Sequence, residues 1–158
     1  MENITNTYYL YPAAIHFSKE PCLVTTILGS CVAVCLWDST LHYGGINHIM
    51  LPLWNGQGLA TPKYGNIAVK KLIDNMLTLG CKKQNLVAKV FGGGEVIDTN
   101  ISNFQIGERN IQMVQQILDD EKIKIVSSSV GGKLGRKIIF NTYDGSVQHK
   151  FIEKTKLF

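Results

Sequence analysis

The chain has 158 residues, of which 45% are hydrophobic and 18% charged, and its formal net charge is +4. This length and apolar content suit one domain with a single core, so we expect residues 1–158 to form one domain. The sequence has neither an apolar run of about 18 residues nor a signal-peptide pattern at its N-terminus. We therefore expect a cytoplasmic protein without membrane insertion.

The 16 Lys and Arg residues are dispersed along the chain, and Lys82 and Lys83 form the densest run. Proteins that bind nucleic acids usually concentrate such residues on one face, between aromatic platforms. We therefore expect no nucleic-acid partner. A mildly basic surface suits docking to an acidic protein, because it raises the encounter rate.

The first predicted strands lead to a Gly-Ser corner. Residues 8–17 are rich in strand-forming residues but contain Pro12, which predicts an edge strand. Residues 22–28 predict the strand that brings the chain to Gly29 and Ser30.

Residues 31–37 and 45–51 are apolar and partly β-branched, which predicts a hairpin joined by residues 38–41. A turn centred between Ser39 and Thr40 would place Cys31 directly opposite His48. Side chains opposite each other on antiparallel strands have Cβ atoms roughly 5 Å apart. The register therefore predicts a thiol and an imidazole as neighbours on one face.

This pairing is typical of a nucleophilic cysteine site. His48 can accept the thiol proton and remain as imidazolium beside the Cys31 thiolate, which is the reactive species. Gly29 permits a backbone bend that aims the Cys31 N–H at the oxygen of an attacked carbonyl, and Ser30 can assist in the same way.

No carboxylate lies near enough in the sequence to orient the imidazole. Thr25 and Thr26, on the strand entering the corner, are the alternatives, because a hydroxyl or a carbonyl can hold an imidazole N–H. The residues by themselves leave the choice between them open.

Two other interpretations of the cysteines must be weighed. Cys35 is predicted to be a small buried hydrophobe, and Cys31 could be one as well. Cys31 and Cys35, followed by His42 and His48, also resemble a zinc site, but positions four apart on a strand are separated by about 13 Å. We therefore expect no metal.

The next stretch combines a long loop with a helix. Residues 53–65 are rich in glycine, and long ordered loops are commonly functional, so Trp54 and Tyr64 are candidates for gripping a substrate. Helical spacing of apolar residues predicts a helix over 66–79, with Asn66 as N-cap and Gly80 closing its end.

A predicted strand over 84–91 ends in a glycine turn. Three glycines follow Phe91, but the Lys and Ser or Thr of a phosphate-binding loop are missing. We therefore interpret Phe91, Gly92 and Gly93 as part of a cleft rim that admits a polypeptide, rather than as a nucleotide site.

The last third predicts a helix over 107–118 and a strand over 123–128, followed by a hairpin of residues 137–143 and 146–152 on an Asp-Gly turn. Arg109 and Asn110, at the start of the helix, are candidates for anchoring a loop. The order of elements predicts an α/β domain whose helices cover one side of a mixed sheet.

Five segments carry a resemblance to a known family: residues 28–38, 44–52, 91–94, 106–110 and 131–136. Together they resemble the CheD family of chemoreceptor glutamine deamidases, and the resemblance runs from about residue 8 to 145. The resemblance implies an α/β/β sandwich related to the deamidase domain of cytotoxic necrotising factors. It assigns the nucleophile to Cys31, the catalytic histidine to His48 and the catalytic threonine to Thr25.

The resemblance also implies the reaction and the partners. We expect a cysteine-dependent amidohydrolase that converts glutamine side chains on the cytoplasmic helices of chemoreceptors to glutamate and ammonia, without a cofactor. A CheC-type phosphatase is an implied partner. The alternatives are a non-catalytic adaptor that binds and stimulates such a phosphatase, and a cysteine peptidase, which would use the same attack on a backbone amide.

Overall fold

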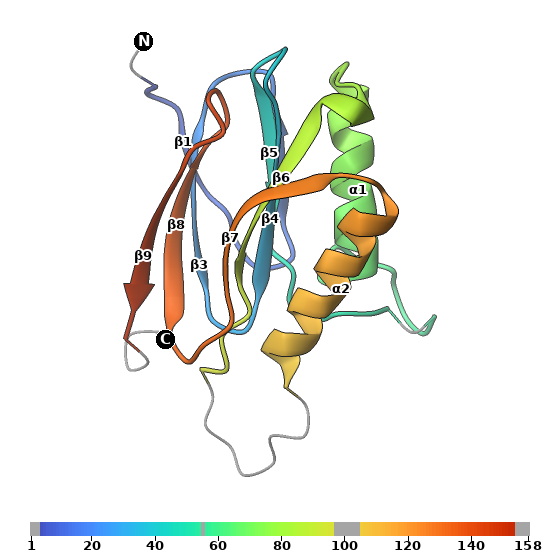
Figure 1. Ribbon diagram of the computed structural model, residues 1–158, viewed down its shortest axis with the longest axis vertical. Helices are drawn as coiled ribbons and strands as arrows, with labels where there is room; N and C mark the ends of the chain where they lie inside the picture. Colours follow the sequence, from blue (N-terminus) through green and yellow to red (C-terminus); the bar gives the residue numbers. More distant parts are fainter. Residues whose placement is uncertain (1–3, 55, 97–104, 154–158) are drawn as a thin grey trace.

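The computed structural model describes residues 4–54, 56–96 and 105–153 (Figure 1). The strands are β1 (Thr7–Tyr9), β2 (Ile15–Ser18), β3 (Leu23–Leu28), β4 (Val32–Asp38), β5 (Tyr43–Asn47), β6 (Leu86–Gly92), β7 (Lys124–Val130), β8 (Gly135–Asn141) and β9 (Val147–Ile152). The α-helices are α1 (Gly65–Thr78) and α2 (Ile106–Asp120), and η1 (Lys83–Asn85) is a short 3₁₀ helix.

These strands form two mixed sheets stacked face to face. One sheet has the order β1-β3-β8-β9 and the other the order β2-β5-β4-β6-β7. Both α-helices pack against the outer face of the five-stranded sheet (Figure 1). The predicted α/β/β layering, with helices on one side, is therefore confirmed.

The central strand β4 is apolar on both faces because the helices cover one face and the four-stranded sheet covers the other. Val32, Val34 and Leu36 belong to the core under the helices. Ala33 and Cys35 belong to the core between the sheets. A strand covered on both faces is nearly continuously hydrophobic, and the buried position predicted for Cys35 is confirmed.

The predicted edge strand over residues 8–17 is in fact two strands in different sheets. β1 lies at the edge of one sheet and β2 at the edge of the other. Pro12 lies between them, where it cannot donate to a ladder. The chain therefore crosses between the sheets at the position that the proline marked.

Helix α1 begins one residue earlier than predicted, and its N-cap is Tyr64 rather than Asn66. The Asn66 Oδ1 instead accepts a hydrogen bond from the Trp54 N–H at 2.9 Å, so this side chain fixes the preceding loop. At the other end, Gly80 has a φ of 104°, the left-handed conformation expected of a residue that closes a helix.

The register of the β4–β5 hairpin differs from the prediction by two residues. Cys35 pairs with Ile46, so the turn is centred one position later than predicted. The Asp38 Oδ1 accepts the N–H groups of Thr40 and Leu41, so the turn comprises residues 39–42 instead of the predicted 38–41, and Asp38 pairs with Tyr43. Because the shift is even, every side chain stays on its predicted face.

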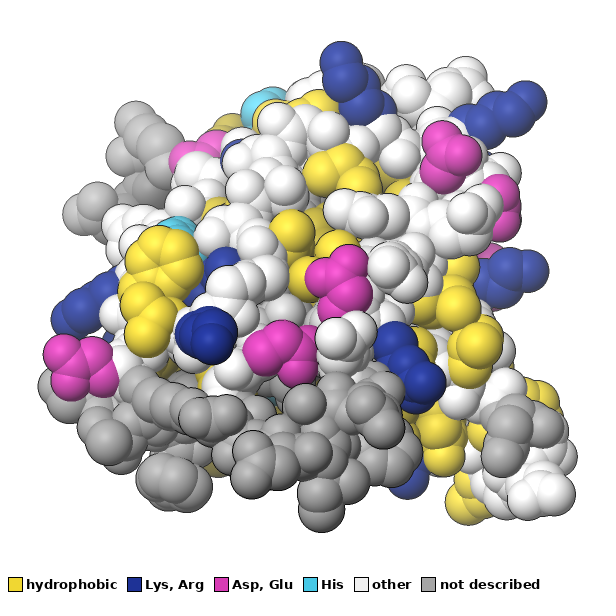
Figure 2. Space-filling model, turned by 60° about the horizontal axis from the view of Figure 1, so that its bottom comes forward, with side chains coloured by type: hydrophobic (Ala, Val, Ile, Leu, Met, Phe, Trp, Pro, Cys, Tyr) yellow, Lys and Arg dark blue, Asp and Glu magenta, His cyan; other side chains and the backbone are white. Residues whose placement is uncertain are grey.

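On the face shown in Figure 2, basic and acidic side chains are interspersed rather than gathered by sign. In the part of the chain that the structure describes, no helix is both long and apolar enough to span a membrane.

Candidate active site

Cys31 and His48 share the face of the five-stranded sheet that looks toward the other sheet. The observed register places Ala33 opposite His48, with a bridge between Val32 and Ile49 just beyond. Cys31 is therefore a diagonal neighbour of His48 rather than the direct partner that we predicted. Diagonal positions are separated by roughly 7–8 Å, so the corrected register keeps the thiol and the imidazole on one face, as diagonal neighbours.

The ladder between β4 and β5 is interrupted beside His48. The Val34 N–H donates to the side-chain Oδ1 of Asn47 at 2.9 Å. The backbone of His48 instead bonds to the segment before β2, through Ala13 and Ala14. The Asn47 side chain thus substitutes for a missing backbone acceptor and lets the chain at His48 follow β2.

A threonine hydroxyl fixes both the position and the tautomer of the imidazole. The Oγ1 of Thr26 lies 2.7 Å from Nδ1 of His48 and donates to the Leu10 carbonyl at 2.7 Å. A hydroxyl has one proton to donate, and a carbonyl can only accept. His48 therefore carries its proton on Nδ1, and Nε2 is the free basic nitrogen.

Thr26 accepts this hydrogen bond from His48, whereas the resemblance assigned the catalytic threonine to Thr25. Thr26 is completely buried. Thr25 is the preceding residue of β3, so its side chain points to the opposite face of the four-stranded sheet. The geometry supports Thr26 as the residue that orients His48, and a catalytic role for Thr25 stays a prediction.

Burial keeps both reactive groups neutral. It raises the pKa of the Cys31 thiol to about 11, although the backbone N–H of the same residue offsets part of the shift. It lowers the pKa of His48, which is 2% exposed, to about 4. At neutral pH the resting site therefore holds a thiol and an imidazole, not the thiolate and imidazolium that the sequence suggested.

Asn110 of α2 holds the Gly-Ser corner in place. Its Nδ2 donates to the carbonyl of Ser30 at 3.0 Å and to that of Met50 at 3.2 Å, which confirms the predicted anchoring role. In a trans peptide the N–H points opposite to the carbonyl. Because α2 holds the Ser30 carbonyl, the Cys31 N–H points away from that helix, toward its own sulfur.

The glycine turn after β6 packs directly on the nucleophile's backbone. The Gly93 N–H donates to the Cys31 carbonyl at 2.8 Å, and the Gly94 N–H to the Gly29 carbonyl at 3.0 Å. Gly92 has a φ of 110°, and a Cβ there would collide with the Cys31 carbonyl. The turn therefore requires glycine at this position to pack against the backbone of Cys31.

Arg136, almost fully buried, secures this turn in its place. Its guanidinium donates to the carbonyl of Gly131 at 2.8 Å and to that of Gly92 at 3.4 Å, and its Nε donates to the Ser129 hydroxyl at 3.1 Å. Burial lowers the pKa of this group. Arg136 thus connects β8 to the turn that supports Cys31.

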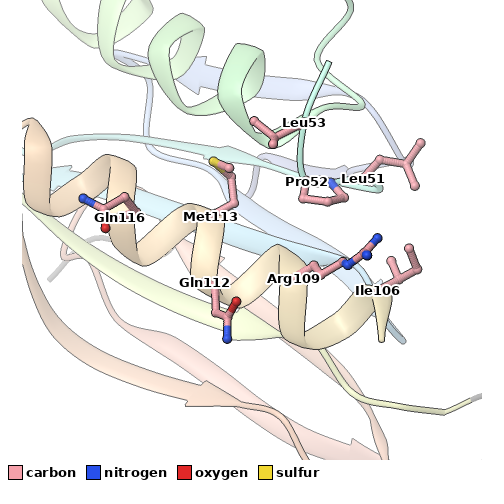
Figure 3. Close-up of a pocket in the computed structure, with 8 residues that line it drawn as sticks. All are labelled: Leu51, Pro52, Leu53, Ile106, Arg109, Gln112, Met113 and Gln116. Carbon is pink, nitrogen blue, oxygen red and sulfur yellow. The ribbon is translucent and has the colours of Figure 1, made fainter. Parts of the chain in front are cut away.

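The residues predicted to form a substrate cleft lie in different places. Phe91 is buried between the sheets, and Gly92 and Gly93 are buried behind the nucleophile. Trp54 and Tyr64 are half-buried in the loop, where the Trp54 indole N–H donates to the Gln57 carbonyl at 3.0 Å. A separate hollow is lined by residues 51–53 and by residues of α2 (Figure 3).

The zinc interpretation can be compared with the observed positions. Cys35 is buried between the sheets, and His42 stacks on Tyr143 near the hairpin turn. Within residues 4–54, 56–96 and 105–153, no three potential metal ligands come together.

Comparison with known proteins gives a consistent result. The family described as CheD chemotactic sensory transduction matches residues 50–151. A protein of Trichlorobacter lovleyi named "Probable chemoreceptor glutamine deamidase CheD" is 53% identical over 89% of this chain and 87% of its own length. One of the same name from Sulfurimonas denitrificans is 46% identical over 94% of this chain and 96% of its own length. The chain belongs to the CheD family.

The family match begins at residue 50, after Cys31 and His48. For this CheD-family chain, the chemistry at those two residues therefore depends on the geometry described above.

Sequence reasoning missed Asn47 and Arg136 as structural supports of the site. Asn is depleted in strands, so an Asn next to His48 in an otherwise apolar run was a signal, whereas Arg136 gave no local one.

Proposed function

We propose that this chain is a protein-glutamine deamidase that acts on chemoreceptors, with Cys31 as nucleophile, His48 as general base and Thr26 as the residue that orients His48. One observation carries the proposal above all: the Thr26 hydroxyl holds Nδ1 of a neutral His48 on the face that Cys31 shares. This contact leaves Nε2 free to take a proton from the thiol. The names of the relatives supply the substrate class.

In the first half of the reaction, Nε2 of His48 takes the thiol proton as the Cys31 sulfur attacks the carboxamide carbon of a glutamine side chain. Because Cys31 and His48 are both neutral at rest, the thiol loses its proton during the attack rather than before it. The oxygen of the tetrahedral intermediate becomes negative, and the Cys31 N–H would donate to it. The imidazolium then protonates the leaving nitrogen, which departs as ammonia.

In the second half, water hydrolyses the thioester. His48 removes a proton from the water, a second tetrahedral intermediate forms at the same carbon, and the sulfur leaves and regains its proton. The product is a glutamate side chain, and the enzyme returns to its neutral resting state. No step requires a metal or a cofactor.

The test is to incubate the protein with purified cytoplasmic fragments of chemoreceptors and to follow each glutamine by peptide mass spectrometry. We expect conversion of glutamine to glutamate, ammonia release and an intact backbone. Cys31→Ala and His48→Ala should each abolish the conversion. Cleaved backbone products would indicate a peptidase instead, and conversion that persists in Cys31→Ala would remove the nucleophile assignment.

The same proposal includes the location and partners of the protein. The chain would act in the cytoplasm, as one domain. A CheC-type phosphatase that occupied the same entrance should inhibit deamidation competitively. If a saturating amount of such a partner left the kinetics unchanged, it would not bind at this site.

A further inference from the structure

Helix α2 begins without a cap from its own N-cap residue. Gln105, at that position, has a left-handed backbone with a φ of 39°, and its side chain makes no capping hydrogen bond within the described part of the chain. An N-cap side chain normally accepts one of the N–H groups that the first turn of a helix leaves free. The first turn of α2 is therefore open to an acceptor from another segment.

Glu95 supplies that acceptor from outside the helix. Its Oε1 accepts the Glu108 N–H at 3.0 Å. Glu108 is the third residue of α2, the position whose N–H an N-cap side chain usually binds. A carboxylate suits this place because the free N–H groups give the start of a helix a partial positive charge. Glu95, 13 residues before Glu108, thus takes over the capping role.

The start of α2 also packs closely on the glycine turn that follows β6. A Cβ on Gly107, the second residue of α2, would collide with the Gly93 carbonyl oxygen and with the Glu95 Oε1. A Cβ on Gly93 would collide with the side chain of Ile111, one turn further along the helix. The capped end of α2 therefore lies directly on the turn that donates to the Cys31 carbonyl.

The backbone around Glu95 is bonded on both sides. The Glu95 N–H donates to the Gly132 carbonyl at 2.8 Å, and the Gly94 N–H donates to the Gly29 carbonyl at 3.0 Å. One residue further on, the Cγ2 of Val96 lies 3.1 Å from the position that a Cβ on Gly29 would take. The capping carboxylate therefore projects from a segment that is itself packed on the Gly-Ser corner.

The cap reaches the nucleophile through Asn110. This residue lies two positions after Glu108 and donates to the carbonyls of Ser30 and Met50. Its Oδ1 is buried and accepts no hydrogen bond from the residues that the structure describes, so those two bonds and the position of the helix fix its side chain. If the start of α2 moved, the peptide before Cys31 would lose the contact that directs its N–H.

We propose that Glu95 is a positioning residue for the nucleophile. Its carboxylate fixes the first turn of α2, the helix holds Asn110, and Asn110 holds the peptide whose N–H stabilises the oxyanion. This inference rests on the proposed deamidase function, because the rate that Glu95 affects is the rate of that reaction.

The first test compares two carboxylates that accept backbone N–H groups. Asp144 accepts the Ser146 N–H at 2.9 Å in the turn between β8 and β9. With a receptor fragment as substrate, Glu95→Ala should lower kcat at least about fivefold and change KM less than about twofold. Asp144→Ala should change neither, and Glu95→Gln, which keeps an oxygen acceptor, should restore most of the rate. Equal kcat values for Glu95→Ala and Asp144→Ala would overturn the proposal.

A double-mutant cycle tests the route of the effect. If Glu95 acts through Asn110, the variant that combines Glu95→Ala with Asn110→Ala should have the kcat of Asn110→Ala alone, within about twofold. A combined loss equal to the product of the two single losses would show that the residues act independently, and it would overturn the assignment.

Hydrogen exchange separates this proposal from the deamidase function. The Gly93 and Gly94 N–H groups donate to carbonyls of the corner, and NMR measures their exchange without any substrate. In Glu95→Ala they should exchange at least about tenfold faster than in the wild-type protein, and in Asp144→Ala at the wild-type rate. Unchanged exchange in Glu95→Ala would overturn the proposal even if the protein deamidates receptors. Faster exchange in a protein without deamidase activity would support the contact and contradict only the proposed function.

Discussion

The two ends of the β4–β5 hairpin are built in different ways. At the turn, pairing is continuous from Cys35 with Ile46 to Asp38 with Tyr43, and the Asp38 carboxylate completes the turn from within it. At the open end, the ladder is interrupted at Asn47, and the strands meet again only at one bridge.

The open end depends on side chains from distant parts of the chain. Asn110 holds the Ser30 carbonyl from 80 residues away, Arg136 secures the glycine turn, and Thr26 holds His48. Side-chain contacts from separate elements therefore replace the regular ladder at the end that carries the chemistry. The difference shows that a local hairpin supplies the scaffold, whereas the site requires the assembled fold.

The largest predicted difference lies between two cysteines of this hairpin. Cys31→Ala should lower kcat at least about 10⁴-fold, because no other group supplies the nucleophile. Cys35→Ala should keep the activity but lower the free energy of unfolding by about 1 kcal/mol, because it removes a buried side chain from the core. Deamidation rates and urea denaturation of both variants measure this contrast, and similar activities would contradict it.

The neutral resting site predicts the pH dependence of alkylation. Cys31 is half-buried and the other three cysteines are buried, so iodoacetamide should modify Cys31 first in the native protein. Because a pKa of about 11 keeps the thiol protonated, the rate should rise about tenfold per pH unit between about pH 7 and 10. Peptide mapping at each pH provides the measurement. A rate that is already constant near neutral pH would reveal a preformed thiolate and refute the neutral pair.

The two threonines of β3 offer a matched pair. Thr26→Val leaves the buried Nδ1–H of His48 without an acceptor and should lower kcat by about 10- to 100-fold. Thr25→Val should have a much smaller effect, whereas Thr26→Ser, which keeps the hydroxyl, should restore most of the rate. If Thr25→Val caused the larger loss, the assignment implied by the family resemblance would be favoured instead.

The prediction with the smallest expected effect compares the turn and the open end of the β4–β5 hairpin. Asn110→Ala and Asp38→Ala each remove two hydrogen bonds to the backbone, so each should lower the free energy of unfolding by about 1–3 kcal/mol. Only Asn110→Ala should also lower kcat, because it releases the peptide that aims the Cys31 N–H. Measuring kcat well below the melting temperatures of both variants separates a loss of activity from a loss of stability. An equal fall in kcat for both variants would show that the two ends of the hairpin are not independent.

The sequence alone determined most of the scaffold, because its signals act over a few residues. Alternating apolar residues predicted the strands, Gly80 predicted the end of α1, and the Asp-Gly turn predicted the last hairpin, which the structure forms between β8 and β9. The alternation of side chains along the predicted strands also placed Cys31 and His48 on one face of the sheet. An error of two residues in the register did not change that result, since side chains alternate with a period of two.

Only the tertiary structure decided how the site is held. The choice of Thr26, the tautomer of His48, the clamp by Asn110 and the support from Arg136 all depend on contacts between elements far apart in sequence. The neutral state of the thiol and the imidazole depends on burial by both sheets, which raises one pKa and lowers the other. Local patterns carry no information on such contacts, because desolvation and hydrogen-bond partners arise only when distant segments pack together.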